Sequence, residues 1–307
     1  MADLHPIAPD APHVSLAPAV FVTGKGGVGK TVVAAGLALA AADRDGRAVY
    51  VEFGDGESGE RAFGGSGSGV EHIVLDPAKA VVAAAAGLFG SQRLARLALD
   101  NFAMRPLLDA APAIRELALL ELARKLVAER PGQRVVFDMP ATGHSIAWLT
   151  VVREVREVTA RGPLHDLCTK IETQLLCPSR ASIVVVTLPE RLVLAETVTL
   201  CETIERDIGL PVDRLIVNRV PTPLPDRALG EALSLASNEG PTAAAARRLA
   251  TYLDERTSVR REVLDALEST IHVREGRGDQ GLTLLPLDPG EPKAQTIADW
   301  LRHAEAA

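Results

Sequence analysis

Short apolar runs rich in β-branched residues recur along the chain, and turn residues separate them from stretches of helical pattern. The runs are apolar at successive positions rather than at alternate ones, so they predict strands of a parallel sheet that is buried on both faces. The predicted strands are 19–23, 48–52, 72–75, 134–138, 182–187, 214–218 and 281–285. Because strands alternate with helices, the pattern predicts an α/β fold with a mostly parallel, twisted sheet flanked by helices.

Two intervals carry helical pattern without any strand. The first, about 77–132, is rich in Ala and Leu, and its segment 114–127 is apolar nearly all round and therefore needs cover on two sides. The second, about 145–180, has amphipathic stripes. Both intervals follow strands and lie at the same end of a parallel sheet, so we expect them to form one inserted helical subdomain. The alternative is that they are crossover helices packed on the sheet.

The chain as a whole is predicted to consist of a short lead followed by one large domain that includes both helical intervals. Residues 1–17 are rich in proline and carry no basic segment, which predicts a disordered lead rather than a signal peptide. Residues 18–307 form the single domain, with an irregular connection over 222–245. The apolar run 31–42 is shorter than the roughly 18 residues that cross a bilayer, so we expect a cytoplasmic protein without stable membrane insertion.

Composition and charge exclude several classes of function. The chain has 307 residues, of which 47% are hydrophobic and 24% charged, as in ordinary globular proteins. A net charge of −7 without a long basic run predicts that the protein does not bind nucleic acid. Cys168, Cys177 and Cys201 form no CxxC pair. This argues against a disulfide framework, a zinc site and an iron–sulfur reductase.

A phosphate-binding motif follows the strand predicted at 19–23. The segment 24–31, GKGGVGKT, matches G-x-x-x-x-G-K-[ST] and opens an Ala-rich helix. Its glycines let backbone N–H groups turn toward phosphate oxygens, Lys30 supplies a cation to the β- and γ-phosphates, and Thr31 supplies a hydroxyl to Mg²⁺. The residues predicted to bind the nucleotide here are Gly26, Gly27, Val28, Gly29, Lys30 and Thr31.

A second lysine, Lys25, lies in the same loop. It is either a solvated charge or a cation that assists phosphoryl transfer, at its own site or across a dimer, and a tight phosphate loop favours the latter role. Asp138 ends a predicted strand and is the expected carboxylate for Mg²⁺. Asn218 also ends a strand, where its amide could read an adenine edge or cap a turn.

The loop 139–144 is a further candidate element of the site. Within it, Thr142 and the Gly143 N–H are expected to sense the γ-phosphate, and His144 is the last residue of the loop. The loop directly follows the strand that ends at Asp138.

Together these segments resemble the deviant-Walker P-loop ATPases of the arsenite-pump (ArsA) and guided-entry type, the second of which targets tail-anchored proteins. The similar segments cover nearly the whole chain after the lead and are 24–31, 73–77, 137–144, 187–190, 217–220 and 284–289. The resemblance implies ATP and Mg²⁺ as ligands, a dimer across which Lys25 acts, and a switch II at 142–144. It also implies an adenine site between Asn218 and Pro286.

The chain departs from this family at several places. It lacks the CxxC zinc pair and the metalloid-binding cysteines, and its helical region contains only Met104 in place of a methionine-rich client groove. It is therefore similar to bacterial members without the zinc motif, some of which are paired, non-identical subunits. Gly54 occupies the position of the family's switch I aspartate, with Asp55 one residue away and Glu52 two before. Asp55 thus joins Lys25 and Lys30 as a candidate catalytic residue, and slow hydrolysis is expected.

Three functions remain open from the sequence. The favoured one is a dimeric ATPase whose nucleotide state opens and closes the helical subdomain around an apolar client or protein partner. The second is a pseudo-ATPase scaffold, or one subunit of a heterodimer with a related ATPase, with weak hydrolysis. The third is a partition-type positioning ATPase. The large helical insertions and the few cations near the apolar residues of the tail 294–307 argue against that third function.

Overall fold

The structure is a computed structural model that describes residues 16–53, 56–65, 67–76, 79–83, 112–140, 142–221, 228–237, 241–274, 281–288 and 290–306. The strands are β1 (Ala19–Thr23), β2 (Ala48–Phe53), β3 (Val70–Leu75), β4 (Arg134–Asp138), β5 (Ala181–Thr187), β6 (Val212–Val220) and β7 (Gly281–Pro286). The helices are α1 (Lys30–Asp45), α2 (Glu57–Phe63), α6 (Pro112–Ala128), α7 (Thr142–Val158), α8 (Pro163–Gln174), α9 (Arg191–Thr203), η1 (Ile204–Ile208), α10 (Ala228–Ala236), α11 (Pro241–Arg274) and α12 (Ala294–Ala306).

The strands form one sheet of seven in the order β3-β2-β4-β1-β5-β6-β7, and every neighbouring pair is parallel. All seven predicted strands are present, each within two residues of its predicted ends. The α/β fold class is therefore confirmed. The continuous apolar runs arise because helices cover both faces, so that no position along a central strand faces water.

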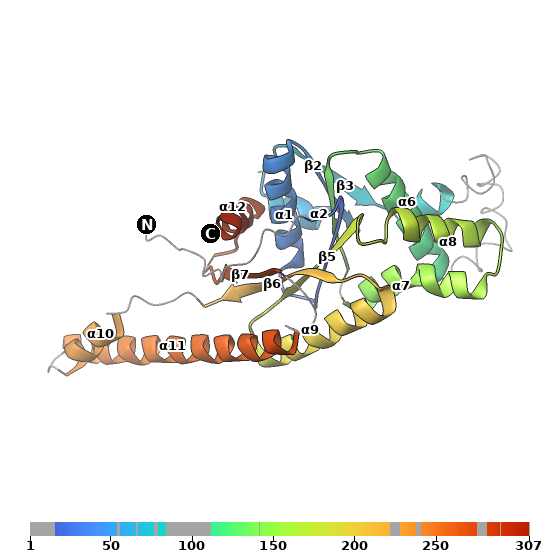
Figure 1. Cartoon of the computed structure of the whole chain (residues 1–307). Helices are drawn as coiled ribbons and strands as arrows, with labels where there is room; N and C mark the ends of the chain where they lie inside the picture. The colour runs from blue at the N-terminus through green and yellow to red at the C-terminus, as the bar shows by residue number, and fades with distance from the viewer. Residues whose placement is uncertain are drawn as a thin grey trace.

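Alternate residues of each strand point into two separate hydrophobic cores. On one face, Val20 and Val22 pack with α1, α2 and α12, while on the other Ala19 and Phe21 pack with α6, α7, α8 and α9. Figure 1 shows these two layers of helices on either side of the sheet. The sheet is thus enclosed, and its ligand-binding surface is left to the strand ends.

Helices α6, α7 and α8 pack against one another and share the second core with the sheet. Leu120 of α6, Trp148 of α7 and Ile171 of α8 are all buried in the same cluster as Phe21 and Phe137. This continuous packing is what crossover helices would show. A separate helical subdomain stays a prediction, since residues 84–111 of the first interval lie outside the described residues.

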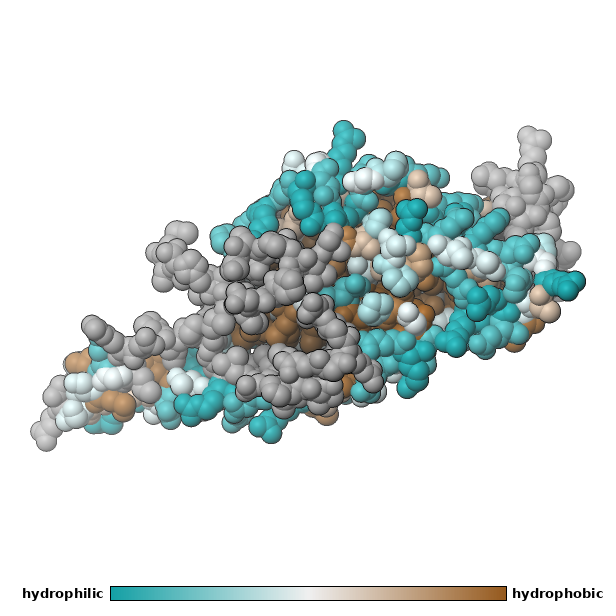
Figure 2. All heavy atoms as spheres, viewed as in Figure 1, coloured by the Kyte–Doolittle hydropathy of each residue, from teal (hydrophilic) through white to brown (hydrophobic). Residues whose placement is uncertain are grey.

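A helical hairpin replaces part of the irregular connection that was predicted over 222–245. The helix α10 lies within that interval, and α11 continues to Arg274. The prediction was wrong because it weighted the flanking Pro and Gly over the helix-forming Ala and Leu of α10, whose Ala232 packs on Ala250 and Leu253. Figure 1 shows α11 extending away from the sheet, and Figure 2 shows hydrophobic residues at the far end of the hairpin that α10 and α11 form.

Packing of the described chain begins before the predicted boundary at residue 18. Leu16 is buried, and the Ala17 N–H donates a hydrogen bond to Ser182 Oγ at 2.9 Å. The rest of the predicted lead, residues 1–15, lies outside the described residues. Among the helices described, none is both long and apolar enough to span a membrane.

The sheet order places a topological switch point at β1. This strand pairs with β4 on one side and with β5 on the other, while the chain runs outward from it in both directions. In open α/β sheets, ligands bind at the carboxyl edge beside such a point. The loop that leaves β1 toward α1 lies there.

Candidate functional site

The loop between β1 and α1 depends on glycines with left-handed backbone conformations. Gly24, Gly27 and Gly29 have φ angles of 146°, 82° and 91°. A Cβ atom on Gly24 would lie 2.1 Å from the Val186 carbonyl oxygen of β5. The loop therefore passes against the neighbouring strand at a distance that only glycine permits, and Gly26 and Gly27 remain exposed. These are the features expected of a backbone that receives phosphate oxygens.

The two lysines of this loop have different surroundings. Lys30 Nζ donates a hydrogen bond to the Lys25 carbonyl oxygen at 3.0 Å, so its ammonium lies across the loop. Burial lowers the pKa of Lys30, while the negative charge of Asp138 opposes that shift. An anion bound in the loop would compensate the desolvated ammonium. Lys25 Nζ instead lies 2.5 Å from Glu196 Oε2 of α9, with both side chains about half exposed.

A hydroxyl and a carboxylate meet at the start of α1. Thr31 Oγ1 donates to Asp138 Oδ2 at 2.8 Å, and Tyr50 Oη donates to the same oxygen at 3.2 Å. Asp138 Oδ1 is buried and has no hydrogen-bond partner in the described part of the chain. Burial raises the pKa of Asp138, although the bonds from Thr31 and Tyr50 and the charge of Lys30 lower it. A buried acceptor without a partner, beside a hydroxyl, fits a hard cation such as Mg²⁺.

Asn218 lies beneath the phosphate loop at the end of β6. Its Nδ2 donates to the Val28 carbonyl oxygen at 2.9 Å, and its Oδ1 accepts from the Arg219 N–H at 2.9 Å. The side chain is only 3% exposed. A Cβ atom on Gly29 would lie 2.5 Å from Asn218 Nδ2, so the loop and the amide are in close contact. The amide thus holds both the loop and the backbone of Arg219, whose φ is 60°.

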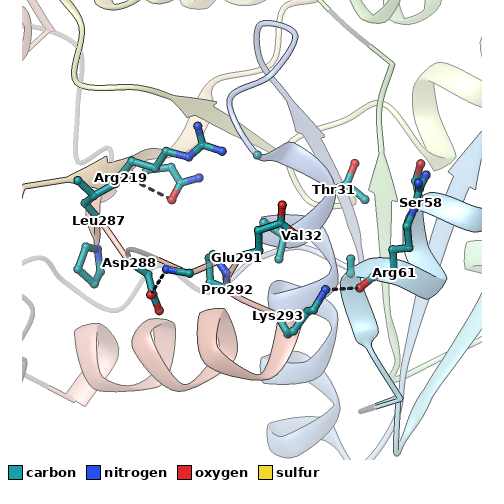
Figure 3. Close-up of a pocket in the computed structure, with 15 residues that line it drawn as sticks. Thr31, Val32, Ser58, Arg61, Arg219, Leu287, Asp288, Glu291, Pro292 and Lys293 are labelled. Atoms are coloured by element: carbon teal, nitrogen blue, oxygen red, sulfur yellow. Dashed lines mark hydrogen bonds between the residues drawn. The ribbon is translucent and has the colours of Figure 1, made fainter. Parts of the chain in front are cut away.

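A cavity of about 490 Å³ opens beside α1, between α2 and the loop that follows β7. Asn218 and Pro286 both line it, as the predicted adenine site requires, together with Thr31. In Figure 3, Thr31 and Val32 of α1 lie between Ser58 and Arg61 of α2 on one side and Arg219, Leu287 and Asp288 on the other. A nucleotide whose phosphates lie in the loop can therefore extend its sugar and base into this cavity.

The structure places the predicted switch residues differently from the sequence interpretation. Helix α7 begins at Thr142, so Thr142, Gly143 and His144 belong to its first turn rather than to a loop. Of these, His144 is exposed, and Thr142 and Gly143 are described only as part of the helix. The helix starts early because the buried Ser145, whose Oγ lies 2.7 Å from Thr23 Oγ1, ties that turn to β1. Asp55 and Gly54 lie outside the described residues.

Several residues at the site were not predicted. They are Tyr50, Ser58, Arg61, His72, Glu196, Arg219 and Lys293. Tyr50 was treated as one more apolar residue of a strand, and Arg219 lies in the segment 217–220 but was given no role of its own. The others carry no local motif. Tyr50 and His72 are polar residues within apolar strands, and this much is visible in the sequence. That they are neighbours is not visible there, because it depends on the register of β2 against β3.

Comparison with known proteins agrees with this geometry. Residues 19–263 match the family described as the CobQ/CobB/MinD/ParA nucleotide binding domain. The chain is 27% identical over 233 residues to the ATPase BagA of Mycobacterium tuberculosis, and the aligned region covers 69% of this chain and 68% of that protein. A putative ATPase of Mycobacterium bovis matches to the same extent. The chain belongs to the CobQ/CobB/MinD/ParA family of nucleotide-binding domains, with a phosphate-binding loop at 24–31.

Proposed function

We propose that this member of the CobQ/CobB/MinD/ParA family is an ATPase of the arsenite-pump and guided-entry type. The observation that carries the proposal is the Thr31–Asp138 pair under the phosphate loop, with a hydrogen bond of 2.8 Å and a second buried Asp138 oxygen unpaired among the described residues. This donor set would suit a Mg²⁺ ion bound together with the nucleotide. Similarity to an ATPase and to a putative ATPase of mycobacteria supports hydrolysis.

The residues of the loop would divide the binding of ATP among them. The N–H groups of Gly26, Gly27 and Gly29 and the N-terminus of α1 hold phosphate oxygens, and Lys30 neutralises their charge. Thr31 and Asp138 would hold Mg²⁺, which would supply positive charge to neutralise the phosphates. Asn218 keeps the loop in the shape that binding requires, because it bonds to the Val28 carbonyl.

The proposal includes a dimer, either with a second copy or with a related ATPase. Lys25 would act across that dimer, which requires it to leave Glu196. Since both side chains are about half exposed, their ion pair contributes on the order of 0–1 kcal/mol, and the attraction of a triphosphate exceeds this easily. The ion pair is therefore compatible with a Lys25 that changes partner when nucleotide binds.

The client part of the proposal rests on exposed apolar side chains of the helices that cover one face of the sheet. Val158 at the end of α7 is 82% exposed, and Ile114 of α6 and Leu164 of α8 are also exposed. We propose that nucleotide state changes the arrangement of α6, α7 and α8 and thereby opens or covers an apolar site for a client or protein partner, with the cytoplasm as the expected location.

A second candidate is a subunit or scaffold that binds ATP but hydrolyses it slowly. The sequence favours it because Gly54 stands where the resembled family has its water-positioning aspartate. A partition-type positioning ATPase is the third candidate and shares the same nucleotide site.

The test compares wild type with Lys30→Ala and Lys25→Ala, and with Lys170→Ala as the control. Lys170 is an exposed lysine of α8, remote from the loop. ATP binding is measured by calorimetry, phosphate release by a coupled assay and mass by light scattering. We expect Lys30→Ala to weaken ATP binding at least about a hundredfold, and Lys25→Ala to retain binding but lose turnover and ATP-dependent association. Unchanged affinity of Lys30→Ala would refute nucleotide binding at the loop. A Lys25→Ala variant that hydrolyses and associates normally would refute the role across the dimer.

A further inference from the structure

Glu52 is a buried carboxylate at the carboxyl end of β2, and only 4% of its surface is exposed. His72 Nε2 of β3 lies 2.6 Å from its Oε1. The backbone N–H of Gly59 in α2 donates to Oε2 at 3.0 Å and to Oε1 at 3.3 Å. A buried carboxylate is unfavourable unless its oxygens accept hydrogen bonds, so these contacts determine where α2 lies.

The bond to Gly59 acts as a helix cap supplied by a neighbouring strand. Gly59 lies in the first turn of α2, where backbone N–H groups have no partner inside the helix. The residue at the N-cap, Gly56, has no side chain with which to accept a bond from them. Glu52 takes that role, and its negative charge is also favourable beside the positive end of the helix dipole.

Gly59 allows α2 to approach the sheet closely. A Cβ atom on Gly59 would lie 2.7 Å from Glu52 Oε1, 2.7 Å from Tyr50 Cε1 and 2.9 Å from His72 Cε1. Such separations are shorter than van der Waals contact, so a side chain there would require either α2 or the side chains of Glu52, Tyr50 and His72 to move. Glycine is unfavourable inside a helix, yet it stands where the helix meets Glu52 and His72.

The opposite side of α2 faces the cavity. Ser58 and Arg61 line it together with Thr31 of the phosphate loop. Figure 3 shows both side chains on α2 beside the cavity, with Lys293 Nζ donating to the Arg61 carbonyl oxygen at 3.3 Å. The position of α2 therefore decides whether a hydroxyl and a guanidinium reach a molecule bound in the cavity.

Tyr50 connects the same helix to the metal carboxylate. Its ring lies edge-on to Phe63 of α2, with centroids 5.2 Å apart, and its hydroxyl donates to Asp138 Oδ2 at 3.2 Å. Outward movement of α2 would remove packing from a ring whose hydroxyl bonds to Asp138.

We propose that Glu52 and His72 are positioning residues that hold α2 against the sheet, so that Ser58 and Arg61 contact the sugar and phosphate side of the bound nucleotide. The identity of the ligand rests on the proposed function. The role of Glu52, His72 and Gly59 in holding α2 follows instead from the contacts described above. Neither Glu52 nor His72 touches the nucleotide; both act through α2.

The test displaces α2 from each side of the contact. Glu52→Ala removes the cap, Gly59→Ala inserts a methyl group, and Glu52→Gln retains a carbonyl oxygen that accepts from the Gly59 N–H. Gly67→Ala is the matched control, because no atom lies within 4 Å of the added methyl. Thermal unfolding identifies the variants that fold, and hydrogen exchange of the α2 amides without nucleotide reports the position of the helix.

We expect faster exchange in α2 and about tenfold weaker ATP binding for Glu52→Ala and Gly59→Ala. We also expect wild-type behaviour for Gly67→Ala and substantial rescue by Glu52→Gln. Because Glu52 acts partly through Arg61, the loss of ATP affinity in the double variant Glu52→Ala/Arg61→Ala should be smaller than the sum of the losses in the two single variants, whereas two independent roles would add.

Two results would overturn the positioning role while leaving the proposed function intact. One is normal ATP affinity in folded Glu52→Ala and Gly59→Ala, which would limit the contact to stability. The other is full additivity in the double variant. Failure of wild type to bind ATP would instead overturn the proposed function, and with it the contact between α2 and the nucleotide.

Discussion

Asn218 provides a direct test of how the phosphate loop is held. The Asn218→Ala variant loses the 2.9 Å bond from Nδ2 to the Val28 carbonyl and the 2.9 Å bond from the Arg219 N–H to Oδ1. Both bonds belong to a side chain that is 3% exposed, so water replaces them poorly in the folded protein. The sequence left two roles open for this amide, namely reading an adenine edge and capping a turn.

The expected magnitude follows from these two bonds. Leaving a buried carbonyl without its partner costs about 1–3 kcal/mol. Arg219 is in the left-handed region at φ 60°, which for a residue with a side chain is unfavourable by about 1–2 kcal/mol, and the bond to Oδ1 offsets part of this. We expect a loss of about 2–4 kcal/mol in the free energy of unfolding. The part of this free energy that comes from the bond to the Val28 carbonyl holds the phosphate loop in shape, so its loss should weaken nucleotide binding about tenfold to a hundredfold.

The assay titrates ATP and GTP into wild type, Asn218→Ala and Asn218→Asp, where the aspartate retains an acceptor for Arg219 but has no donor for Val28. If the amide holds the loop, both variants lose affinity for ATP and GTP by the same factor. Thr197→Ala is the control, because Thr197 is also buried, with hydrogen bonds of 2.7 Å to Thr187 and to the Val193 carbonyl. It should lose stability without losing affinity. A loss confined to ATP, or unchanged affinity for both nucleotides, would refute the reasoning.

Two further predictions concern carboxylates. Asp138→Asn should abolish the Mg²⁺-dependent part of ATP binding and yet stabilise the nucleotide-free protein at neutral pH. Burial raises the pKa of Asp138, so its ionised form destabilises the fold above that raised pKa, and the penalty disappears as the pH falls through it. Urea unfolding of the variant and wild type at a series of pH values measures this, and identical curves at every pH would contradict it. If Asp55 has replaced the switch I aspartate, Asp55→Asn should reduce hydrolysis by on the order of a hundredfold or more while ATP still binds. If it has not, wild type should hydrolyse ATP slowly and Asp55→Asn should have nearly the same rate. Rapid hydrolysis by a homodimer, unaffected by Asp55→Asn, would exclude both cases.

The fold was predictable because its signals are local. Each central strand is a short apolar run, and turn residues or prolines bound it, as Pro211 and Pro221 bound β6. Covering both faces of the sheet makes such runs obligatory, so the sequence must contain them wherever a buried parallel strand occurs. The hairpin of α10 and α11 was missed for the opposite reason. Much of its surface faces water, as exposed Leu233 and Tyr252 show, so burial imposes no strong pattern on it.

The site divides in the same way. Phosphate-binding residues are consecutive in the chain, because a loop and the first turn of a helix can form the whole cradle. The contact of Glu52 with His72 instead depends on β3 lying beside β2 in a register that pairs Tyr50 with His72. Asn218 reaches Val28 because β5 and β6 follow β1 in the sheet. Strand order and register are set by the packing of the whole domain, and a single sequence contains no direct record of them.

One physical feature nevertheless unites Asp138 and Asn218, which the sequence assigned to the site, with Glu52, which it considered only beside the switch I position. All three are polar residues within two positions of the carboxyl ends of strands β2, β4 and β6. A buried polar group is unfavourable unless it is bonded, so its presence at such a position indicates a specific partner. For Asn218 that partner is the phosphate loop, and for Glu52 it is a helix at the edge of the cavity. For Asp138 one oxygen has partners within the described chain, and the other is buried without a partner among the described residues. The same criterion that identified Asp138 as a metal ligand therefore applies to Glu52, provided that a neighbouring helix is considered as a partner alongside a ligand.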